Sequence, residues 1–126
     1  MTTLADTNIL IDYLRGRAQA VDLVRRMSDG TDPLGASALS RTELLAGVRD
    51  HERSDLDRLF LLLEWAPVTT EIADAAGDYS RRYRSSNQAI DIVDYVVAAT
   101  ASVLGAELLT LNIRDFPMFP GLRAPY

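Results

Sequence analysis

Four acidic residues, Asp6, Glu43, Asp94 and Asp115, are spaced so that they could meet at one site of a folded chain. Crowded carboxylates repel one another and raise each other's pKa, so a fold tolerates them best when a cation compensates their charge. A hard divalent ion such as Mg²⁺ (or Mn²⁺) prefers oxygen ligands and keeps several waters beside one or two carboxylates. A metal held in this way activates a water for attack on phosphorus. The chemistry that these residues predict is phosphodiester hydrolysis.

Asp6 and Asp94 stand at the starts of predicted helices. A short, partly β-branched strand over 2–5 ends at Asp6, and a helix over 8–16 with a glycine stop follows. The most apolar helix of the chain opens at Asp91, carries Asp94 in its first turn and ends before a glycine. A charge at the entrance of so apolar a helix needs a partner, which favours a functional role for Asp94.

Glu43 and Asp115 also have purely structural explanations. Ser40 and Glu43 have the spacing of a capping box, which predicts a helix beginning there with Glu43 in its first turn. Asp115 follows a strand over 107–111, where a turn acid would fit as well. Asp91 likewise has a structural explanation, as the cap of the helix that contains Asp94. Polar residues beside the acids are candidates for supporting roles: Thr7, Asn8, Asp91, Thr110 and Asn112.

Strands alternate with helices along the whole chain, which predicts an α/β fold. The remaining elements are helices over 18–27, 55–64 and 70–83 and strands over 34–39 and 65–68, with Pro67 favouring a sheet edge for the last. This order implies βαβ units, a mostly parallel central sheet of four to five strands and helices on both faces, giving three α/β/α layers. Ligands bind beyond the carboxyl ends of such strands, so we expect one edge to collect the four acids.

Composition restricts the class of protein. The 126 residues are 48% hydrophobic and contain no linker-like stretch, which predicts one domain over 1–126. Cysteine is absent, which excludes disulfides and thiolate metal sites and is typical of a cytoplasmic protein. No signal peptide or membrane span is indicated. The only histidine, His51, lies in a charged stretch and predicts neither histidine catalysis nor a multi-histidine zinc site.

The charge balance bears on nucleic-acid binding. A net charge of −5 argues against phosphate ligands, but acids that surround divalent ions no longer repel them. All 13 basic residues are arginines, which suit bidentate phosphate contacts. The candidates for RNA contacts are Arg15, Arg41, Arg81, Arg82 and Arg84, although the run at 81–84 also fits an exposed, charged helix end.

Four segments surround the predicted acids, in this order along the chain: Asp6-Thr7-Asn8-Ile9-Leu10-Ile11-Asp12-Tyr13-Leu14-Arg15-Gly16, Ser40-Arg41-Thr42-Glu43-Leu44-Leu45-Ala46-Gly47, Asp94-Tyr95-Val96-Val97-Ala98-Ala99-Thr100-Ala101 and Thr110-Leu111-Asn112-Ile113-Arg114-Asp115-Phe116. In these segments the chain resembles the PIN-domain ribonucleases, and most closely the VapC toxins of bacterial toxin–antitoxin pairs. The resemblance makes Asp6, Glu43 and Asp94 metal ligands, with Asp94 preferred over Asp91. Some members carry aspartate where this chain has Asn112, so the fourth group is either Asp115 or Asn112.

The resemblance further implies a PIN-like fold and an Mg²⁺- or Mn²⁺-dependent endoribonuclease that inhibits translation or growth when free of its antitoxin. It implies a homodimer, a cognate VapB-type antitoxin and a toxin–antitoxin hetero-oligomer. The alternatives are a structure-specific DNA nuclease and a non-catalytic RNA-binding domain of the same fold. Receiver-type domains depend on a lysine and P-loop enzymes on a GK[ST] sequence, and the chain has neither.

Overall fold

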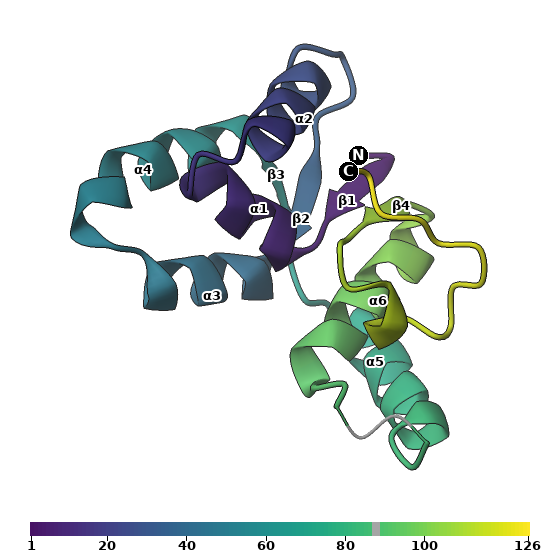
Figure 1. Ribbon diagram of the computed structural model, residues 1–126. Coiled ribbons are helices and arrows are strands. Elements are labelled where there is room, and N and C mark those ends of the chain that lie inside the picture. The colour runs from purple at the N-terminus through teal and green to yellow at the C-terminus, as the bar shows by residue number, and fades with distance from the viewer. Residues whose placement is uncertain (87–88) are drawn as a thin grey trace.

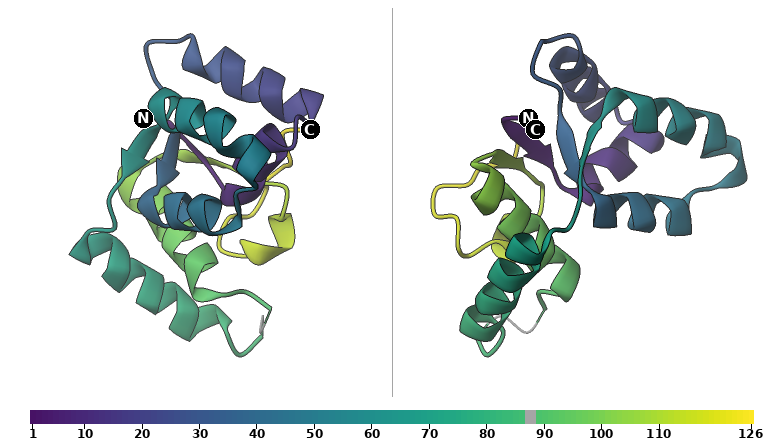
Figure 2. Two further views of the ribbon diagram at one scale, coloured as in Figure 1. Left: turned by 90° about the vertical axis from the view of Figure 1, so that its left-hand side faces the viewer. Right: turned by 180° about the vertical axis from the view of Figure 1, so that it is seen from behind.

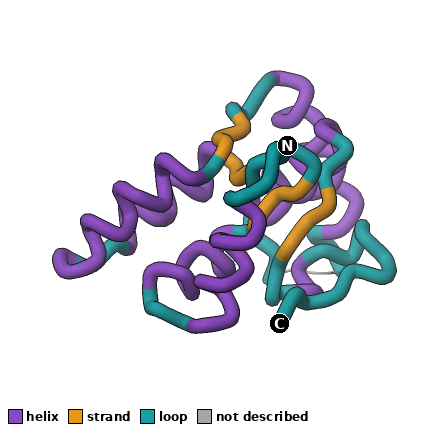
Figure 3. The backbone as a smooth tube through the Cα atoms, turned by 90° about the horizontal axis from the view of Figure 1, so that it is seen from above, coloured by secondary structure: helices purple, strands orange, loops and turns teal. Residues whose placement is uncertain are grey.

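Four short parallel strands form the centre of the computed structural model, which describes residues 1–86 and 89–126. The strands are β1 (Thr3–Ala5), β2 (Gly35–Ser37), β3 (Glu64–Ala66) and β4 (Glu107–Leu109), and their order in the sheet is β3-β2-β1-β4. Figure 3 shows them as a small group of strands surrounded by helices and loops. The parallel sheet agrees with the prediction, and β3 lies at an edge, as Pro67 indicated.

Helices cover both faces of this sheet (Figure 1). One side carries α1 (Thr7–Leu14), α2 (Ala18–Ser28), α3 (Ala38–Gly47) and α4 (Arg53–Leu62), and the other carries α5 (Thr70–Tyr83) and α6 (Ile92–Leu104). Figure 2 shows the same division from two further directions. Two short 3₁₀ turns, η1 (Asp50–Glu52) and η2 (Ile113–Asp115), complete the elements. No helix among the described residues has the length and apolar character that a bilayer crossing requires.

Alternation along the strands divides the core into two layers. Ala5 of β1 and Ala36 of β2 pack with the apolar faces of α1 to α4, whereas Leu4 and Leu108 pack with α6. Phe116, just after η2, is buried in this second layer. The sheet is therefore closed on both sides, and its strand ends are the places where polar side chains can gather.

Glycine ends the two helices that matter most for the acids. Gly16 follows α1 with φ +77°, and Gly105 follows α6 with φ +64°, a left-handed conformation that glycine adopts without a steric penalty. Both stops were predicted. They follow α1, which Asp6 caps, and α6, which carries Asp94 in its first turn.

The predicted capping box at Ser40 and Glu43 is wrong. Helix α3 begins at Ala38 and its cap is Ser37, whose Oγ accepts the N–H of Leu39 over 3.2 Å. Ser37 already ends β2, so the chain turns directly from strand to helix and the better-spaced Ser40 falls inside α3. Glu43 consequently lies in the second turn of the helix and not in the first.

Other boundaries shift by a few residues, as is usual for element ends. The predicted helix over 55–64 is α4, which ends at Leu62 because Glu64 enters β3. The predicted strand over 107–111 ends at Leu109, so Thr110 belongs to the turn beyond the strand end. His51 is exposed in η1, between α3 and α4, as expected of the charged stretch around it.

Candidate active site

Asp6 is held in place by three different hydrogen-bond donors. It follows β1 and caps α1, where Oδ1 accepts the N–H of Thr7 over 2.8 Å. Its Oδ2 accepts from Thr110 Oγ1 at 2.8 Å and from Asn8 Nδ2 at 3.1 Å. The residue is only 5% exposed, and burial, followed by the nearby charges of Glu43 and Asp115, raises its pKa above the ordinary value. Asp6 is thus a fixed carboxyl group whose negative charge needs compensation.

Thr110 connects the end of β4 to the start of α1. The register pairs Ala5 with Leu109, so the next residues along the two strands, Asp6 and Thr110, are neighbours. The fully buried Thr110 hydroxyl accepts from Asn8 Nδ2 at 3.2 Å and from the Asn112 N–H at 3.0 Å while donating to Asp6. This one side chain therefore orients residues from two segments of the predicted site.

Glu43 reaches the site from α3 and is positioned by Thr7. The Thr7 hydroxyl donates to Glu43 Oε1 over 2.6 Å and also lies 2.8 Å from Ser40 Oγ. A carboxylate only accepts, so Thr7 gives its single proton to Glu43 and receives one from Ser40. The buried Ser40 that looked like a cap is instead part of a hydrogen-bond chain that ends on Glu43.

Asp94 lies in the first turn of α6, and Asp91 caps that helix. Asp91 Oδ1 accepts the N–H groups of Val93 and Asp94 at 2.9 and 3.2 Å, and the Asp91 N–H donates to Asp94 Oδ2 at 3.3 Å. Burial raises the pKa of Asp94 to about 7, and the charges of Asp91, Asp6 and Asp115 contribute further. The capping role predicted for Asp91 is confirmed, and its negative charge acts on Asp94 as well.

One pocket of about 300 Å³ collects the four predicted acids. Its lining also includes Ile11 and Ala89, which the sequence analysis did not single out. Ile11 lies one turn beyond Thr7 and Asn8 on α1, so helical spacing alone could have placed it here. The pocket residues are Asp6, Thr7, Asn8, Ile11, Glu43, Ala89, Asp91, Asp94, Asn112 and Asp115. Asn112 and Asp115 both line it, so the choice of the fourth group stays open.

The pocket fits a hard, hydrated divalent cation. Its polar lining consists of carboxylates, the Thr7 side chain and the side-chain amides of Asn8 and Asn112. Burial and neighbouring negative charge raise the pKa values of Asp6 and Asp94, and a cation would compensate the charge of these groups. Within residues 1–86 and 89–126, no three acids already converge closely enough to hold an ion by themselves. Mg²⁺ commonly keeps several waters and uses one or two protein carboxylates, so it does not require such a group. The role of each acid as a ligand stays a prediction.

The arginines predicted to contact RNA lie outside the lining of this pocket. Arg15 pairs with the buried Glu52, its Nη1 lying 2.9 and 2.8 Å from the two carboxylate oxygens. Arg41 stacks its guanidinium over Phe60, 4.0 Å from the ring centroid. Arg81 pairs with an acid one turn earlier at 3.5 Å, and Arg82 and Arg84 lie exposed at the end of α5. Helix-end positions suit such cations. Their contact with RNA stays a prediction.

Sequence patterns did not reveal the burial of Glu52. It lies in the charged stretch that contains His51, yet it is only 2% exposed. The N–H of Arg49 and the charge of Arg15 hold the pKa of Glu52 below its usual value. Nothing in the local sequence distinguishes this acid from its exposed neighbours, because its partner is 37 positions away.

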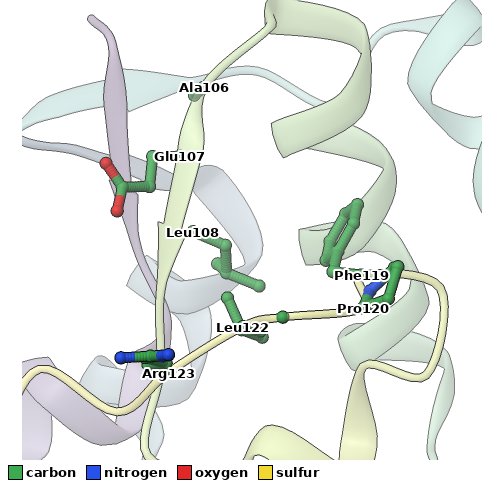
Figure 4. Close-up of a pocket in the computed structure, with 8 residues that line it drawn as sticks. Ala106, Glu107, Leu108, Phe119, Pro120, Leu122 and Arg123 are labelled. Carbon is green, nitrogen blue, oxygen red and sulfur yellow. The ribbon is translucent and has the colours of Figure 1, made fainter.

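A second hollow of about 400 Å³ lies at the opposite end of β4. It is formed between the amino end of that strand and the segment after η2, and Leu108, Phe119 and Leu122 gather around it (Figure 4). Its charged lining residues are Glu107 and Arg123. None of the predicted site residues lines this hollow, so the acid pocket is the candidate active site.

Comparisons with known proteins agree with this geometry. The family model described as PIN domain matches residues 3–120. The chain is 49% identical over 123 residues to Ribonuclease VapC19 of Mycobacterium tuberculosis, covering 98% of each chain. It is 44% identical over 124 residues to Ribonuclease VapC10 of the same species, covering 98% of this chain and 92% of the relative.

Among solved structures, the fold resembles a chain of a toxin–antitoxin complex from Klebsiella pneumoniae. The TM-score is 0.80 at 26% identity, and the match covers 98% of both chains. The predicted α/β/α fold and the family resemblance are both confirmed, and members of this family generally depend on a divalent metal. The chain therefore belongs to the PIN-domain family and, within it, to the VapC ribonucleases.

Proposed function

We propose that this chain is an Mg²⁺- or Mn²⁺-dependent endoribonuclease that hydrolyses RNA phosphodiester bonds. In this proposal it acts as the toxin of a VapBC-type toxin–antitoxin pair and inhibits translation or growth when free of its antitoxin. The observation that carries the proposal is the single pocket that gathers Asp6, Glu43, Asp94 and Asp115 from segments far apart in the sequence. Two relatives of similar length are named ribonucleases, which supports RNA as the substrate.

The residues of the chain divide the work of the site. Asp6, Glu43 and Asp94, together with Asp115 or Asn112, surround the hydrated cation, and one or two of the carboxylates bind it directly. Thr110 and the Thr7 N–H fix the direction of the Asp6 carboxylate, and the Thr7 hydroxyl fixes that of Glu43. A bound divalent ion supplies an activated water and compensates charge on the leaving oxygen. With its pKa raised to about 7, Asp94 is only partly ionised near neutral pH, and a bound cation would favour its ionised form.

The proposed partners are a VapB-type antitoxin and a second copy of this chain. The similar solved structure is that of a toxin–antitoxin complex, which supports an antitoxin partner. We expect a short reading frame for a DNA-binding antitoxin directly upstream of the gene. The homodimer and the toxin–antitoxin hetero-oligomer rest on the family alone, and light scattering of the purified chain with and without the antitoxin would test them.

The direct test is cleavage of labelled RNA by the purified chain, free of any antitoxin. We expect cleavage with Mg²⁺ or Mn²⁺, none with excess chelator, and none of a DNA of the same sequence. Asp94→Asn and Glu43→Gln keep the shape of each side chain and should each lower the rate by more than about 100-fold. The control is Asp22→Asn, an exposed acid on α2 that pairs with Arg26.

Each other outcome identifies a different function. Cleavage of DNA in place of RNA would make the chain a DNA nuclease. Binding of RNA without any metal-dependent cleavage would make it a non-catalytic RNA-binding domain. Unchanged rates in Asp94→Asn and Glu43→Gln, with melting temperatures like that of the parent, would show that the acid pocket is not the active site.

A further inference from the structure

Arg114 carries an exposed positive charge at the edge of the acid pocket. It is the middle residue of η2 (Ile113–Asp115), and both Asp115, which follows it, and Asn112, which caps the turn, line the pocket. Many other arginines are paired with an acid on the protein itself, namely Arg15, Arg17, Arg26, Arg53, Arg58 and Arg81. Arg114 has no ion-pair partner within the described part of the chain. Its charge is therefore available to a ligand.

A third hollow, of about 650 Å³, lies beside η2 and is lined by Leu111, Asn112, Ile113, Arg114 and Asp115. Asn112 and Asp115 also line the acid pocket, so Arg114 lies beside residues that both hollows share. A strand with one phosphate at the acids and the next phosphate over η2 would meet Arg114.

The backbone beneath Arg114 is anchored. The N–H of Asp115 donates to the carbonyl of Asn112 over 3.0 Å, and that of Phe116 donates to Ile113 over 3.1 Å. Phe116 itself is 1% exposed and is part of the core beneath α6. A guanidinium on such an anchored turn loses less freedom on binding than one on a loose loop.

We propose that Arg114 binds a phosphate of the RNA strand adjacent to the phosphate that is cleaved. This proposal rests on the RNA substrate of the proposed function. A chain with a net charge of −5 must offset the repulsion between its acids and a polyanion. A planar guanidinium does this with two parallel hydrogen bonds to phosphate oxygens. Arg114 is a substrate-binding residue in this arrangement, and it takes no part in holding the metal.

The test compares Arg114→Gln with Arg123→Gln. Arg123 is a matched control because it is also exposed and also lines a hollow, the one at the amino end of β4 (Figure 4). That hollow shares no lining residue with the acid pocket. Cleavage of a fluorescently labelled single-stranded RNA of mixed sequence is measured with Mg²⁺ over a range of salt concentrations. The same RNA is titrated against each variant in the cleavage-deficient Asp94→Asn background to measure Kd.

We expect Arg114→Gln to raise KM and Kd about tenfold and to lower the salt dependence of binding by about 0.7 of a log–log slope unit. Its kcat should change much less than its KM, and Arg114→Lys should restore the salt dependence and part of the affinity. Arg123→Gln should match the parent protein in all three measurements.

Three outcomes would overturn the proposal, and they differ in what else they affect. If the parent cleaves RNA and Arg114→Gln has the same KM, Kd and salt dependence, the phosphate contact is absent while the proposed function stands. If the parent neither binds nor cleaves the RNA, the proposed function fails and the contact fails with it. A loss of kcat alone in Arg114→Gln, with unchanged KM and Kd, would also contradict a binding role.

Discussion

Thr110 donates its hydroxyl hydrogen to Asp6 Oδ2 over 2.8 Å, although the two residues are 104 positions apart in the sequence. The bond exists because β1 and β4 are neighbouring parallel strands that end at the same level. Thr110→Val keeps the shape of the side chain and removes the hydroxyl. We expect it to lower the free energy of unfolding by about 1–3 kcal/mol, because buried polar groups lose their partner. RNA cleavage should fall by about 10–100-fold, as for other groups that orient a metal ligand.

Thr100→Val is the matched control for that change. Thr100 is as buried as Thr110, but its hydroxyl donates to the carbonyl of Val96 within α6, at 2.7 Å. Its removal leaves the helical hydrogen bond of that carbonyl in place, so both stability and cleavage should stay close to those of the parent. Equal loss of activity in the two variants, measured by initial rates at saturating Mg²⁺, would show that Thr110 has only a packing role.

Asp94 should make the metal-free protein less stable as the pH rises. Its pKa is about 7 in the folded chain against 3.8 in the unfolded chain, so the folded state binds its proton more tightly. This contribution is complete below about pH 4 and is lost as the pH rises through about 7. With chelator present, the parent should therefore lose melting temperature between about pH 5 and pH 8, and Asp94→Asn should lose less.

The same titration predicts how metal binding depends on pH. A cation competes with the proton on Asp94, so Mg²⁺ should raise the melting temperature more at about pH 8 than at about pH 5. Thermal unfolding at both pH values, with Mg²⁺ or with chelator, measures this difference. The exposed Asp22→Asn variant should behave as the parent does. An identical response to Mg²⁺ at both pH values would argue against Asp94 as a ligand.

Two substitutions of Asp91 separate its capping role from its charge. Asp91→Asn retains an oxygen that accepts the N–H groups of Val93 and Asp94, and asparagine caps helices as well as aspartate does. It should leave stability nearly unchanged and lower the pKa of Asp94, because the charge of Asp91 contributes to raising it. Asp91→Ala should cost about 1 kcal/mol of unfolding free energy. Chemical denaturation and pH–rate profiles measure the two effects.

Both Asp91 variants should still cleave RNA, with the acidic limb of the pH–rate profile of Asp91→Asn shifted to lower pH. A large loss of turnover in Asp91→Asn, at an unchanged melting temperature, would instead place Asp91 among the metal ligands.

Substitutions of Arg15 and Glu52 should have coupled effects on the stability of the protein. Arg15→Met leaves the buried Glu52 carboxylate without its ion-pair partner, which is more costly than the loss of an exposed pair. We expect a clear drop in melting temperature, and a smaller drop in the double variant Arg15→Met/Glu52→Met than the sum of the single changes. The control is Arg26→Met, which breaks the exposed pair with Asp22 and should change the melting temperature little.

This pair also tests the predicted RNA contact of Arg15. A contact with substrate would raise KM in Arg15→Met beyond what the loss of stability explains. An unchanged KM at a temperature where the variant is fully folded would assign Arg15 to the fold alone.

The fold could be predicted from the sequence because its signals are local. Apolar spacing and the stops at Gly16 and Gly105 located α1 and α6, and the alternation of strands with helices indicated the parallel sheet. The start of α3 was missed for a physical reason. Two serines, Ser37 and Ser40, could each cap a helix, and only the end of β2 decides between them. The spacing to Glu43 favoured the wrong one.

The sequence predicted those features of the site that follow from the positions of residues along strands and helices. Asp6 and Asp94 stand directly at element ends, so topology brought them to one pocket with the predicted partners. The hydrogen bonds that orient them could not be foreseen, because Thr110 and Asp6 become neighbours only through the strand register. Arg114 was likewise overlooked as a binding residue. A single arginine does not indicate a binding surface in the sequence, whereas an arginine-rich run such as the one at 81–84 does.

The residues of the acid pocket range from Asp6 to Asp115 in the sequence. In the sheet, β1 lies between β2 and β4, although β4 is the last of the four strands to be translated. During translation, the nascent chain therefore contains Asp6, Glu43 and Asp94 before it contains β4 and Thr110. It then lacks the strand and the hydroxyl that orient Asp6. We expect chains that stop before Glu107 to be harmless to the cell that expresses them, and a growth assay with such truncated genes would show it. If the chain is toxic as proposed, the parallel order of the strands should delay that toxicity until β4 has been translated.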